Sequence, residues 1–331
     1  MTLGSEFDTI RRYFAPLSAG FPGAFGLAND AATWCPSEGC DAVITTDCMV
    51  AGVHFLTDDP PQSVAAKILA VNLSDIAAMG ARPVAYTLAA AWPKQTDEAW
   101  IADFAAGLGE AQTGAGVVLI GGDTVSTPGP MVLTITAIGE IHTGKALTRS
   151  GSAEGDDVYV TGTIGDAALG LLVLNGSFAP GSDADKDYLI GRYRTPTARS
   201  GVGAGLAGLA TAALDVSDGL VQDLGHLARE SGVEIAVNRD ELPVSPAARR
   251  ALDRDAAHWD LVFGGGDDYE LAFTATPGSA AAIDALAVSS GTRITKIGTV
   301  ATATAEENPG VIILGGDGNK ISVARAGYRH F

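Results

Sequence analysis

Aspartates that adjoin Gly, Ser, Thr or Asn recur along this chain at the ends of apolar segments. The sites are Asn29-Asp30, Thr45-Thr46-Asp47, Ser74-Asp75, Gly122-Asp123, Asp215-Val216-Ser217-Asp218 and Asp267-Asp268. Oxygen ligands without Cys or paired His are typical of magnesium rather than zinc sites. Because Mg²⁺ usually takes one or two carboxylates together with water and substrate phosphates, so many acids predict several ions around a polyphosphate.

Taken one at a time, each of these acids is also typical of a helix cap or a turn. We assign that structural role to Asp166 and Asp268. For the recurring set a shared metal site is the better interpretation, because capping does not explain why the same pattern returns so often.

Asp75 lies within a long apolar segment that predicts a helix. The run from Ser63 to Met79 is rich in Ala, Leu, Ile and Val, which predicts a helix that ends at Gly80. One stripe of this helix consists of Val64, Ile68, Val71 and Asp75. A carboxylate on an apolar stripe must be paired, hydrogen-bonded, protonated or bound to a cation, and Lys67 is too far along the helix for a local ion pair. On this helix alone, a side chain that reaches solvent at the stripe's edge is an equal alternative.

Composition and charge limit the class of protein. The 331 residues exceed the usual size of one domain, and 47% hydrophobic residues can bury a sizeable core. A formal charge of -18 argues against nucleic acid and anionic membranes as partners, but allows phosphorylated ligands if divalent cations lie between the two anions. No apolar run reaches the ~20 residues that span a bilayer, and the N-terminus lacks the pattern of a signal peptide. The three cysteines match no zinc spacing, which favours free thiols in a reducing cytoplasm.

Apolar and β-branched runs alternate with helical patterns, which predicts two α/β or α+β domains. Strands are expected at residues 41–46, 84–91, 117–120, 131–138, 157–161, 233–237 and 271–274, with two more closing the chain. Helices are expected at residues 5–15, 63–79, 97–113, from 166 onward, 199–212, 219–230 and 280–289. Residues 175–187 are expected to form a polar loop, and the turn-rich Gly144–Gly155 places a domain boundary between residues 1–150 and 151–331.

Several common catalytic patterns do not occur. The chain has no Gly-x-x-x-x-Gly-Lys-Ser/Thr loop, which excludes a P-loop enzyme, and Gly162-x-x-Gly165 is too weak for a dinucleotide fingerprint. The five scattered histidines give no Ser-His-Asp order.

Six segments together resemble the thiamine-monophosphate kinase family, and the match runs through nearly the whole chain. They are Thr45–Phe55, Val71–Ala81, Leu119–Thr124, Ala146–Gly151, Asp215–Gly219 and the closing Gly327-Tyr-x-His-Phe331. Residues 72–81 alone would indicate the wider superfamily, which includes aminoimidazole ribonucleotide synthetase and selenophosphate synthetase. His54 with its neighbours, Arg149 in its setting and the C-terminal segment make the resemblance specific to the kinase.

The resemblance implies an α/β (α+β) fold of two domains, similar to that of aminoimidazole ribonucleotide synthetase. The N-terminal domain would hold a mixed sheet with helices, bind ATP and Mg²⁺, and form a homodimer through a shared β-barrel. The C-terminal α/β domain would complete the nucleotide and substrate site. The implied activity is phosphoryl transfer from ATP to thiamine monophosphate, which gives thiamine diphosphate. Such transfer needs positioning and charge neutralisation more than a covalent nucleophile.

The same resemblance assigns roles to individual residues. The metal ligands would be Asp30, Thr45, Thr46, Asp47, Asp75, Asp123, Asp215 and Asp218. ATP would contact Gly122, Asp123, Arg149 and Ser217, and His54 and Asp267 would face the thiamine phosphate. Catalysis would rest on Asp75, Asp123, Arg149 and Asp218, with Arg149 stabilising charge on the transferring group.

The sequence departs from the family pattern at three places. The usual Gly-Asp-Asp near the N-terminus is Ala28-Asn29-Asp30, a usual Glu is Asp267, and Arg325 stands where an aromatic residue would contact the substrate. The first change concerns metal affinity and the other two concern substrate fit. They leave two alternatives open, namely another ATP-dependent enzyme of the superfamily or a non-catalytic binder of ATP or thiamine phosphates. The retained Asp47, Asp75, Asp123 and Arg149 argue against the binder.

Overall fold

The computed structural model describes residues 6–303 and 309–328, and this part of the chain forms two compact units. The first unit holds the described residues up to Ile76 together with Ala81–Gly144. The second holds Ala77–Gly80 and the described residues from Lys145 onward. The second unit therefore resumes at the start of the turn-rich stretch in which the sequence predicts a boundary.

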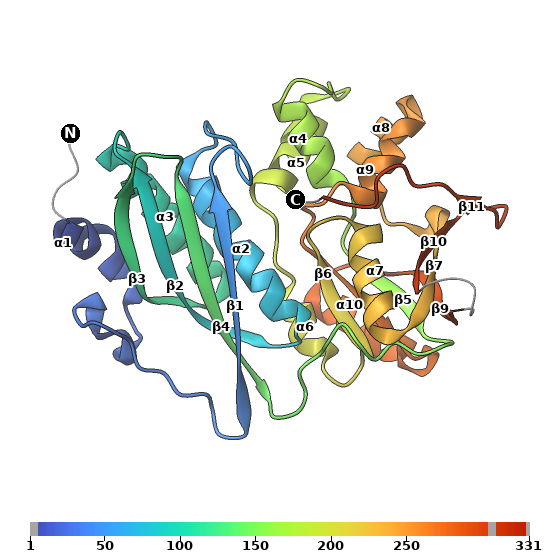
Figure 1. Cartoon of the computed structure of the whole chain (residues 1–331), viewed down its shortest axis with the longest axis horizontal. Helices are drawn as coiled ribbons and strands as arrows, with labels where there is room; N and C mark the ends of the chain where they lie inside the picture. The colour runs from blue at the N-terminus through green and yellow to red at the C-terminus, as the bar shows by residue number, and fades with distance from the viewer. Residues whose placement is uncertain (1–5, 304–308, 329–331) are drawn as a thin grey trace. The chain divides into compact units, whose positions relative to one another are not determined.

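The first unit is a four-stranded sheet with helices on one face (Figure 1). Its elements are α1 (Glu6–Thr9), η1 (Ile10–Phe14), η2 (Ala15–Ser18), η3 (Pro22–Leu27), β1 (Cys40–Val50), α2 (Pro61–Ala78), β2 (Arg82–Pro93), α3 (Glu98–Ala115), β3 (Val118–Thr127) and β4 (Val132–His142). The strand order is β1-β4-β2-β3; β4 is antiparallel to β1 and β2, and β2 is parallel to β3. The sheet is therefore mixed, as the resemblance implies.

Helix α3 shows how local sequence sets this arrangement. Asp97 caps its first turn by accepting a 2.7 Å hydrogen bond from the backbone N–H of Trp100, and Gly116 ends it in the left-handed conformation. Trp100 and Phe104 lie edge-on against Trp92 of β2, with ring centroids 5.8 and 5.6 Å away. Full burial of an aromatic side chain such as Phe104 stabilises the fold by ~1.5–3 kcal/mol, so this contact holds α3 on the sheet.

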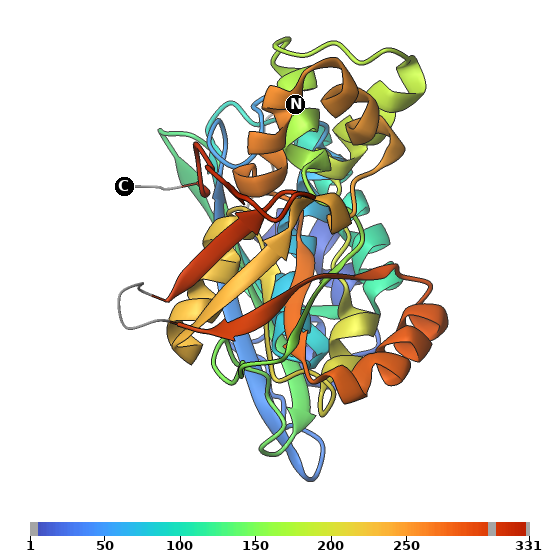
Figure 2. The same ribbon diagram turned by 90° about the vertical axis from the view of Figure 1, so that its right-hand side faces the viewer.

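The second unit is a seven-stranded mixed sheet, whose strands β9 and β10 are drawn in orange to red in Figure 2. Its strands are β5 (Asp157–Thr161), β6 (Ala212–Val216), β7 (Val233–Asn238), β8 (Glu270–Ala275), β9 (Ile294–Thr302), β10 (Gly310–Leu314) and β11 (Lys320–Ile321), in the order β11-β10-β7-β9-β5-β8-β6. Its helices are α4 (Asp166–Leu174), α5 (Asp183–Arg194), α6 (Ser200–Leu206), α7 (Leu220–Ser231), α8 (Pro246–Arg254), α9 (Trp259–Gly264) and α10 (Ala280–Ser290). Three short 3₁₀ turns complete it, at Arg239–Glu241, Ala256–His258 and Pro277–Ser279.

The central strands of this sheet are buried on both faces. Every residue of β5, β6 and β8 is buried. One core joins the strands to Leu220, Leu224 and Leu227 of α7, and a second joins them to α6 and α10. Strands covered on both faces read as continuous apolar runs, so these short elements carry little alternation in the sequence.

Three examples show where the sequence expectations differ from the structure. The strand expected to end at Ile120 continues as β3 to Thr127, because residues 121–127 still pair with β2. The expected polar loop at residues 175–187 contains the start of α5, whose cap is Ser182 and whose first turn is acidic. Helix α6 ends at Leu206, short of the predicted end at residue 212, because the chain turns at residues 207–209 before β6 begins at Ala212.

Three further predictions concern membrane-spanning helices, the cysteines and the C-terminal motif. Among the described residues, no helix combines the length and apolar character that crossing a bilayer requires. Cys35, Cys40 and Cys48 are free thiols, as the sequence predicts. His330 and Phe331, which end the C-terminal motif, lie outside the described residues.

Candidate functional site

Thr45 on β1 and Asp75 on α2 meet through their side chains in the first unit. The Thr45 hydroxyl donates a 2.6 Å hydrogen bond to Oδ2 of Asp75. Asp75 is half-buried, on the same helix as the fully buried Ile68. The Asp75 carboxylate is thus hydrogen-bonded to a hydroxyl group. Hydrogen bonding is one of the ways in which a carboxylate on an apolar stripe can be stabilised.

Asn72 fixes β1 relative to α2 next to this pair. Its side chain is completely buried; Oδ1 accepts a 3.0 Å hydrogen bond from the backbone N–H of Asp47, and Nδ2 donates one of 2.9 Å to the Ile68 carbonyl. Both polar ends of the amide are therefore satisfied, and Asp47 is tied to the helix that carries Asp75. The sequence alone predicts no role for Asn72, although an amide within an apolar helix signals a buried hydrogen-bonding site.

Thr46 lies on the other face of β1. Successive strand residues point to opposite faces, and the Thr46 hydroxyl donates 3.0 Å to the Ile135 carbonyl and lies 3.1 Å from the hydroxyl of Thr136, both on β4. The Thr46 side chain therefore points away from Thr45 and Asp75.

His54 is held by the loop that follows β1. Its Nδ1 accepts a 3.0 Å hydrogen bond from the backbone N–H of Val50, so the proton of the neutral ring is on Nε2. Lys67 of α2, only 2% exposed, donates 3.1 Å to the backbone carbonyl of His54. The buried ammonium therefore anchors the loop that carries this predicted substrate residue.

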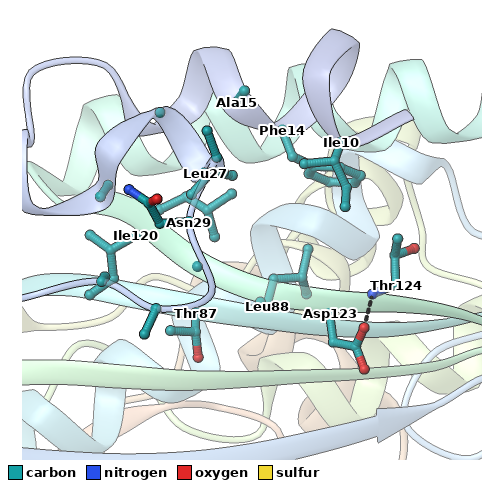
Figure 3. A pocket seen from close by; sticks show the side chains of 18 of the residues that line it. Ile10, Phe14, Ala15, Leu27, Asn29, Thr87, Leu88, Ile120, Asp123 and Thr124 are labelled. Carbon is teal, nitrogen blue, oxygen red and sulfur yellow. Dashed lines mark hydrogen bonds between the residues drawn. The ribbon is translucent and has the colours of Figure 1, made fainter. Parts of the chain in front are cut away.

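Asp30, Gly122 and Asp123 line one pocket of about 820 Å³ in the first unit (Figure 3). Ile10, Phe14, Leu27, Leu88 and Ile120 give it an apolar wall, and Asn29, Thr87 and Asp123 give it polar groups. Gly122 has a φ of 154°, and a Cβ there would lie 1.9 Å from the Leu88 carbonyl oxygen, so only glycine fits. Oδ1 of Asp123 accepts a 2.8 Å hydrogen bond from the backbone N–H of Thr124. Pockets of this size and mixed lining are typical of small-molecule sites.

The donor set of the first unit suits magnesium better than a metal that needs a complete protein cage. Within the described residues, no three His, Cys, Asp or Glu side chains form a ready-made cluster for an ion. Mg²⁺ is usually bound by one or two carboxylates, with waters and phosphates as its remaining ligands. The Asp75 carboxylate beside the Thr45 hydroxyl, with Asp47 held nearby by Asn72, fits that mode.

In the second unit, Asp215, Ser217 and Asp218 lie at the C-terminal end of β6 and in the turn that leads to α7. Asp215 is buried in the strand, whereas Ser217 and Asp218 are partly exposed. Oδ2 of Asp218 accepts a 3.0 Å hydrogen bond from Nε2 of Gln222. Oδ2 of Asp223, on α7, accepts hydrogen bonds from the backbone N–H groups of residues 217–219. Burial, with the nearby Asp218 carboxylate, raises the pKa of Asp223 to about 7.

Asp267 lies beside the same turn. Its backbone N–H donates a 2.7 Å hydrogen bond to the Ser217 carbonyl, and its φ of 64° is in the left-handed region, which Asp tolerates better than most residues. The C-terminal segment also reaches this turn, because the backbone N–H of Tyr328 donates 2.9 Å to the Asp218 carbonyl. The Arg325 guanidinium lies 6.0 Å from the centre of the Tyr328 ring. This backbone contact brings an aromatic residue, Tyr328, next to Asp218.

Arg149 is exposed in the segment that precedes β5. Its neighbour Thr148 accepts a 3.0 Å hydrogen bond from the backbone N–H of Ala213 on β6, and its own carbonyl accepts one of 3.4 Å from Ser231 at the end of α7. Arg149 and Asp218 act in opposite directions on the pKa of His226, Arg149 lowering it and Asp218 raising it, while burial contributes most to its net lowering. The Arg149 backbone is therefore anchored at the start of β6 and the end of α7, opposite the Ser217–Asp218 turn, while its charge acts on His226 within α7.

A buried charged cluster behind Asp267 was not predicted from the sequence. Glu270 is fully buried and accepts hydrogen bonds from Thr161, Arg192 and Arg199. Asp268, 1% exposed, accepts backbone hydrogen bonds from Gly165 and Ala167 at the start of α4, which confirms its assigned turn or cap role. Burial raises the pKa of Asp268 to about 8, against the opposing charge of Arg192. The cluster fixes the base of the loop that carries Asp267.

Family models and individual relatives of known function place this chain in the same protein family. The N-terminal domain of AIR synthase related proteins matches residues 28–141, and the C-terminal domain of the same family matches residues 153–308. The chain is 41% identical over 297 residues to thiamine-monophosphate kinase of Caulobacter vibrioides, covering 89% of this chain and 83% of that protein.

Solved structures agree with the sequence comparison. A crystal structure of thiamine-monophosphate kinase from Stenotrophomonas maltophilia superposes with a TM-score of 0.80 at 41% identity, covering 89% of this chain and 91% of that one. AaThiL complexed with AMPPCP and TMP superposes with a TM-score of 0.77 at 28% identity, covering 93% and 97% of the two chains.

Proposed function

Because the chain belongs to the thiamine-monophosphate kinase family of AIR synthase related proteins, we propose that it transfers the γ-phosphoryl group of ATP to thiamine monophosphate. The product would be thiamine diphosphate, and the enzyme a phosphotransferase of thiamine biosynthesis. The observation that carries this proposal is the near-complete match to these kinases, one of which, AaThiL, is described as complexed with an ATP analogue and TMP.

We propose that the first unit supplies most of the oxygen ligands for magnesium. Asp30, Thr45, Asp47, Asp75 and Asp123 would contribute side chains, and Thr46 its carbonyl. When bound, Mg²⁺ neutralises phosphate charge and orients the reacting groups. The Thr45 hydroxyl would hold the Asp75 carboxylate in one orientation, so that its second oxygen keeps a fixed direction.

The nucleotide is proposed to use the pocket beside β3. Gly122 lines this pocket with backbone atoms alone, because a side chain there would collide with the Leu88 carbonyl. The apolar wall of this pocket suits a base, and its polar side holds Asp30 and Asp123. In the second unit, Asp215 and Asp218 are proposed as further metal ligands, Ser217 as an ATP contact, and Arg149 as the cation that stabilises the transferring phosphoryl group.

The acceptor is proposed to contact His54 and Asp267. His54 would present a neutral ring whose proton is on Nε2, and such an N–H can donate to a phosphate oxygen. The Asp267 carboxylate would attract the cationic thiazolium ring of thiamine monophosphate. Transfer would be direct, since the substrate's own phosphate oxygen can attack the γ-phosphorus.

A homodimer through the first unit is part of the proposal. β1 is an edge strand that pairs only with β4 among the described strands. Ile44 on β1 is 65% exposed and Val125 on β3 is 52% exposed, and strand alternation places both on the sheet face turned away from α2 and α3. An exposed edge with apolar side chains is a typical docking surface for a second copy. Free cysteines are consistent with a cytoplasmic location, which we also propose.

Product analysis tests the proposed reaction against the alternatives. The purified protein is incubated with ATP, Mg²⁺ and thiamine monophosphate, with thiamine as a matched acceptor that lacks the phosphate. Mass spectrometry should detect thiamine diphosphate from the first acceptor and no phosphorylated product from thiamine. Tight binding of both ligands without any product would instead identify a binding protein.

A further inference from the structure

One buried carboxylate organises the turn that carries Ser217 and Asp218. Asp223 is 5% exposed, and its Oδ2 accepts hydrogen bonds from the backbone N–H groups of Ser217, Asp218 and Gly219, at 3.1, 3.0 and 3.1 Å. We propose that Asp223 is a positioning residue, which touches neither substrate nor metal but fixes this turn in its binding geometry. This inference rests on the proposed function of Asp218 and Asp267.

The opposite side of the same turn is used as well. The Ser217 carbonyl accepts from the backbone N–H of Asp267, at 2.7 Å, and the Asp218 carbonyl accepts from that of Tyr328, at 2.9 Å. With Asp223 bound to the N–H groups, the peptide groups of the turn are fixed from both sides. A shift of the turn would therefore move Asp218, Asp267 and Tyr328 together.

Hydrogen bonds must hold the turn at residues 217–219 in one conformation, because the segments packed around it are rich in glycine. A Cβ at Gly266 would lie 2.7 Å from the Ser217 carbonyl oxygen, and one at Gly219 would lie 2.7 Å from the Cα of Gly264. Backbones this close leave no room for packed side chains, and glycine loses more conformational freedom on ordering than any other residue. A buried acceptor shared by three donors provides the constraint that side-chain packing cannot.

The position of Asp223 also decides what the turn can bind. Successive backbone N–H groups before a helix are a common binding site for phosphate. Here the chain fills that site with its own carboxylate, so these three amides are already satisfied. A substrate phosphate would then reach this turn through a cation held by Asp218 rather than through backbone N–H groups.

Two substitutions separate a hydrogen-bonding role from a role for charge. Asp223→Asn keeps an acceptor oxygen and the shape of the side chain, whereas Asp223→Ala removes the acceptor. We expect Asp223→Ala to raise the Mg²⁺ concentration for half-maximal activity and the KM for thiamine monophosphate, each by ~10-fold or more. Asp223→Asn should stay within ~3-fold of the wild type, because the amides keep a partner.

Hydrogen exchange gives a readout that needs no substrate. The amides of residues 217–219 should exchange fastest in Asp223→Ala and at an intermediate rate in Asp223→Asn. The control is Asp185→Ala, which removes another buried carboxylate, bound to Arg250 between α5 and α8. It should lower the thermal midpoint without changing the Mg²⁺ dependence, the KM or the exchange of residues 217–219.

Three results would overturn the inference. Asp223→Asn could be as impaired as Asp223→Ala while the amides stay protected, which would show that the charge acts directly. Asp223→Ala could keep wild-type kinetics and protection. If Asp223→Ala does not fold, Asp223→Asn alone decides the case. Wild-type exchange rates of residues 217–219 together with strongly altered kinetics in Asp223→Asn would again show that the charge acts directly. A wild-type protein that makes no thiamine diphosphate would refute the proposed function, whereas faster exchange in Asp223→Ala would still support the positioning role.

Discussion

The Thr45 hydroxyl donates a 2.6 Å hydrogen bond to the Asp75 carboxylate. This bond joins β1 to α2 and brings the Thr45–Asp47 motif against the helical motif that contains Asp75. The bond explains how a half-buried carboxylate is tolerated on an apolar helical face. It also restricts the rotamer of Asp75, as a ligand that binds a cation in one geometry requires. The same contact thus stabilises the first unit and prepares an oxygen ligand.

We predict that Asp75→Asn keeps the fold and lowers kcat by ~100-fold or more, because it removes charge that balances the transferring phosphoryl group. Circular dichroism with steady-state kinetics measures both properties. Asp103→Asn, which changes an exposed acid on α3, is the control and should have wild-type kinetics. If Asp75→Asn unfolds while its activity per folded molecule is unchanged, Asp75 is a structural acid.

Asp267→Ala should raise the KM for thiamine monophosphate ~5- to 10-fold and leave the KM for ATP nearly unchanged. The reason is the loss of one partly solvated attraction to the thiazolium cation. Asp267→Glu should be tolerated, although glutamate adopts the positive φ of 64° less readily than aspartate. Kinetics in both substrates decide the case, and a defect confined to ATP would assign Asp267 to the nucleotide side.

The dimer prediction concerns the exposed face of the first unit's sheet. Sedimentation should find a homodimer at micromolar concentration, and Ile44→Lys should weaken it, because a charge would be buried against an apolar partner. Val288→Lys, at an apolar position of α10 that is 84% exposed, is the matched control and should stay dimeric. Monomeric wild-type protein, or equal dissociation of both variants, would contradict this assignment.

Stability should depend on pH through Asp268. Its pKa is raised from 3.8 to about 8 by burial, so the folded state binds more protons than the unfolded state between these values. The free energy of unfolding is therefore expected to fall as pH rises from 5.5 to 8, by ~3 kcal/mol for this one group. Urea unfolding at both pH values should show a smaller fall in Asp268→Asn. An equal fall in both proteins would show that Asp268 is ionised throughout this range.

The sequence predicts the parts of this protein whose signal is local. The stripe that ends in Asp75 indicates both the helix and the need for a compensating group, and Gly80 marks the turn that ends it. The motif of residues 121–124 predicts a metal or ATP ligand at Asp123. The segment is the middle of β3 rather than its end, because pairing with β2 continues through glycines that carry no strand signal.

What the sequence does not reveal depends on partners far away along the chain. Arg199 and Glu270 are 71 residues apart and meet only because β8 lies inside the sheet next to β5 and β6. Asp223 is close to Ser217 in sequence, yet it resembles an ordinary acid in the first turn of a helix. Its role becomes visible only when three N–H groups are found on one buried oxygen.

The fate of the γ-phosphoryl group is the most direct test of the proposed reaction. The protein is given ATP labelled in its γ-phosphate together with unlabelled thiamine monophosphate and Mg²⁺, and the products are separated and identified. Direct transfer predicts that the label appears in the terminal phosphate of thiamine diphosphate, with one ADP formed for each thiamine diphosphate. Label recovered as inorganic phosphate, with thiamine monophosphate unchanged, would contradict the assignment of this chain as a thiamine-monophosphate kinase.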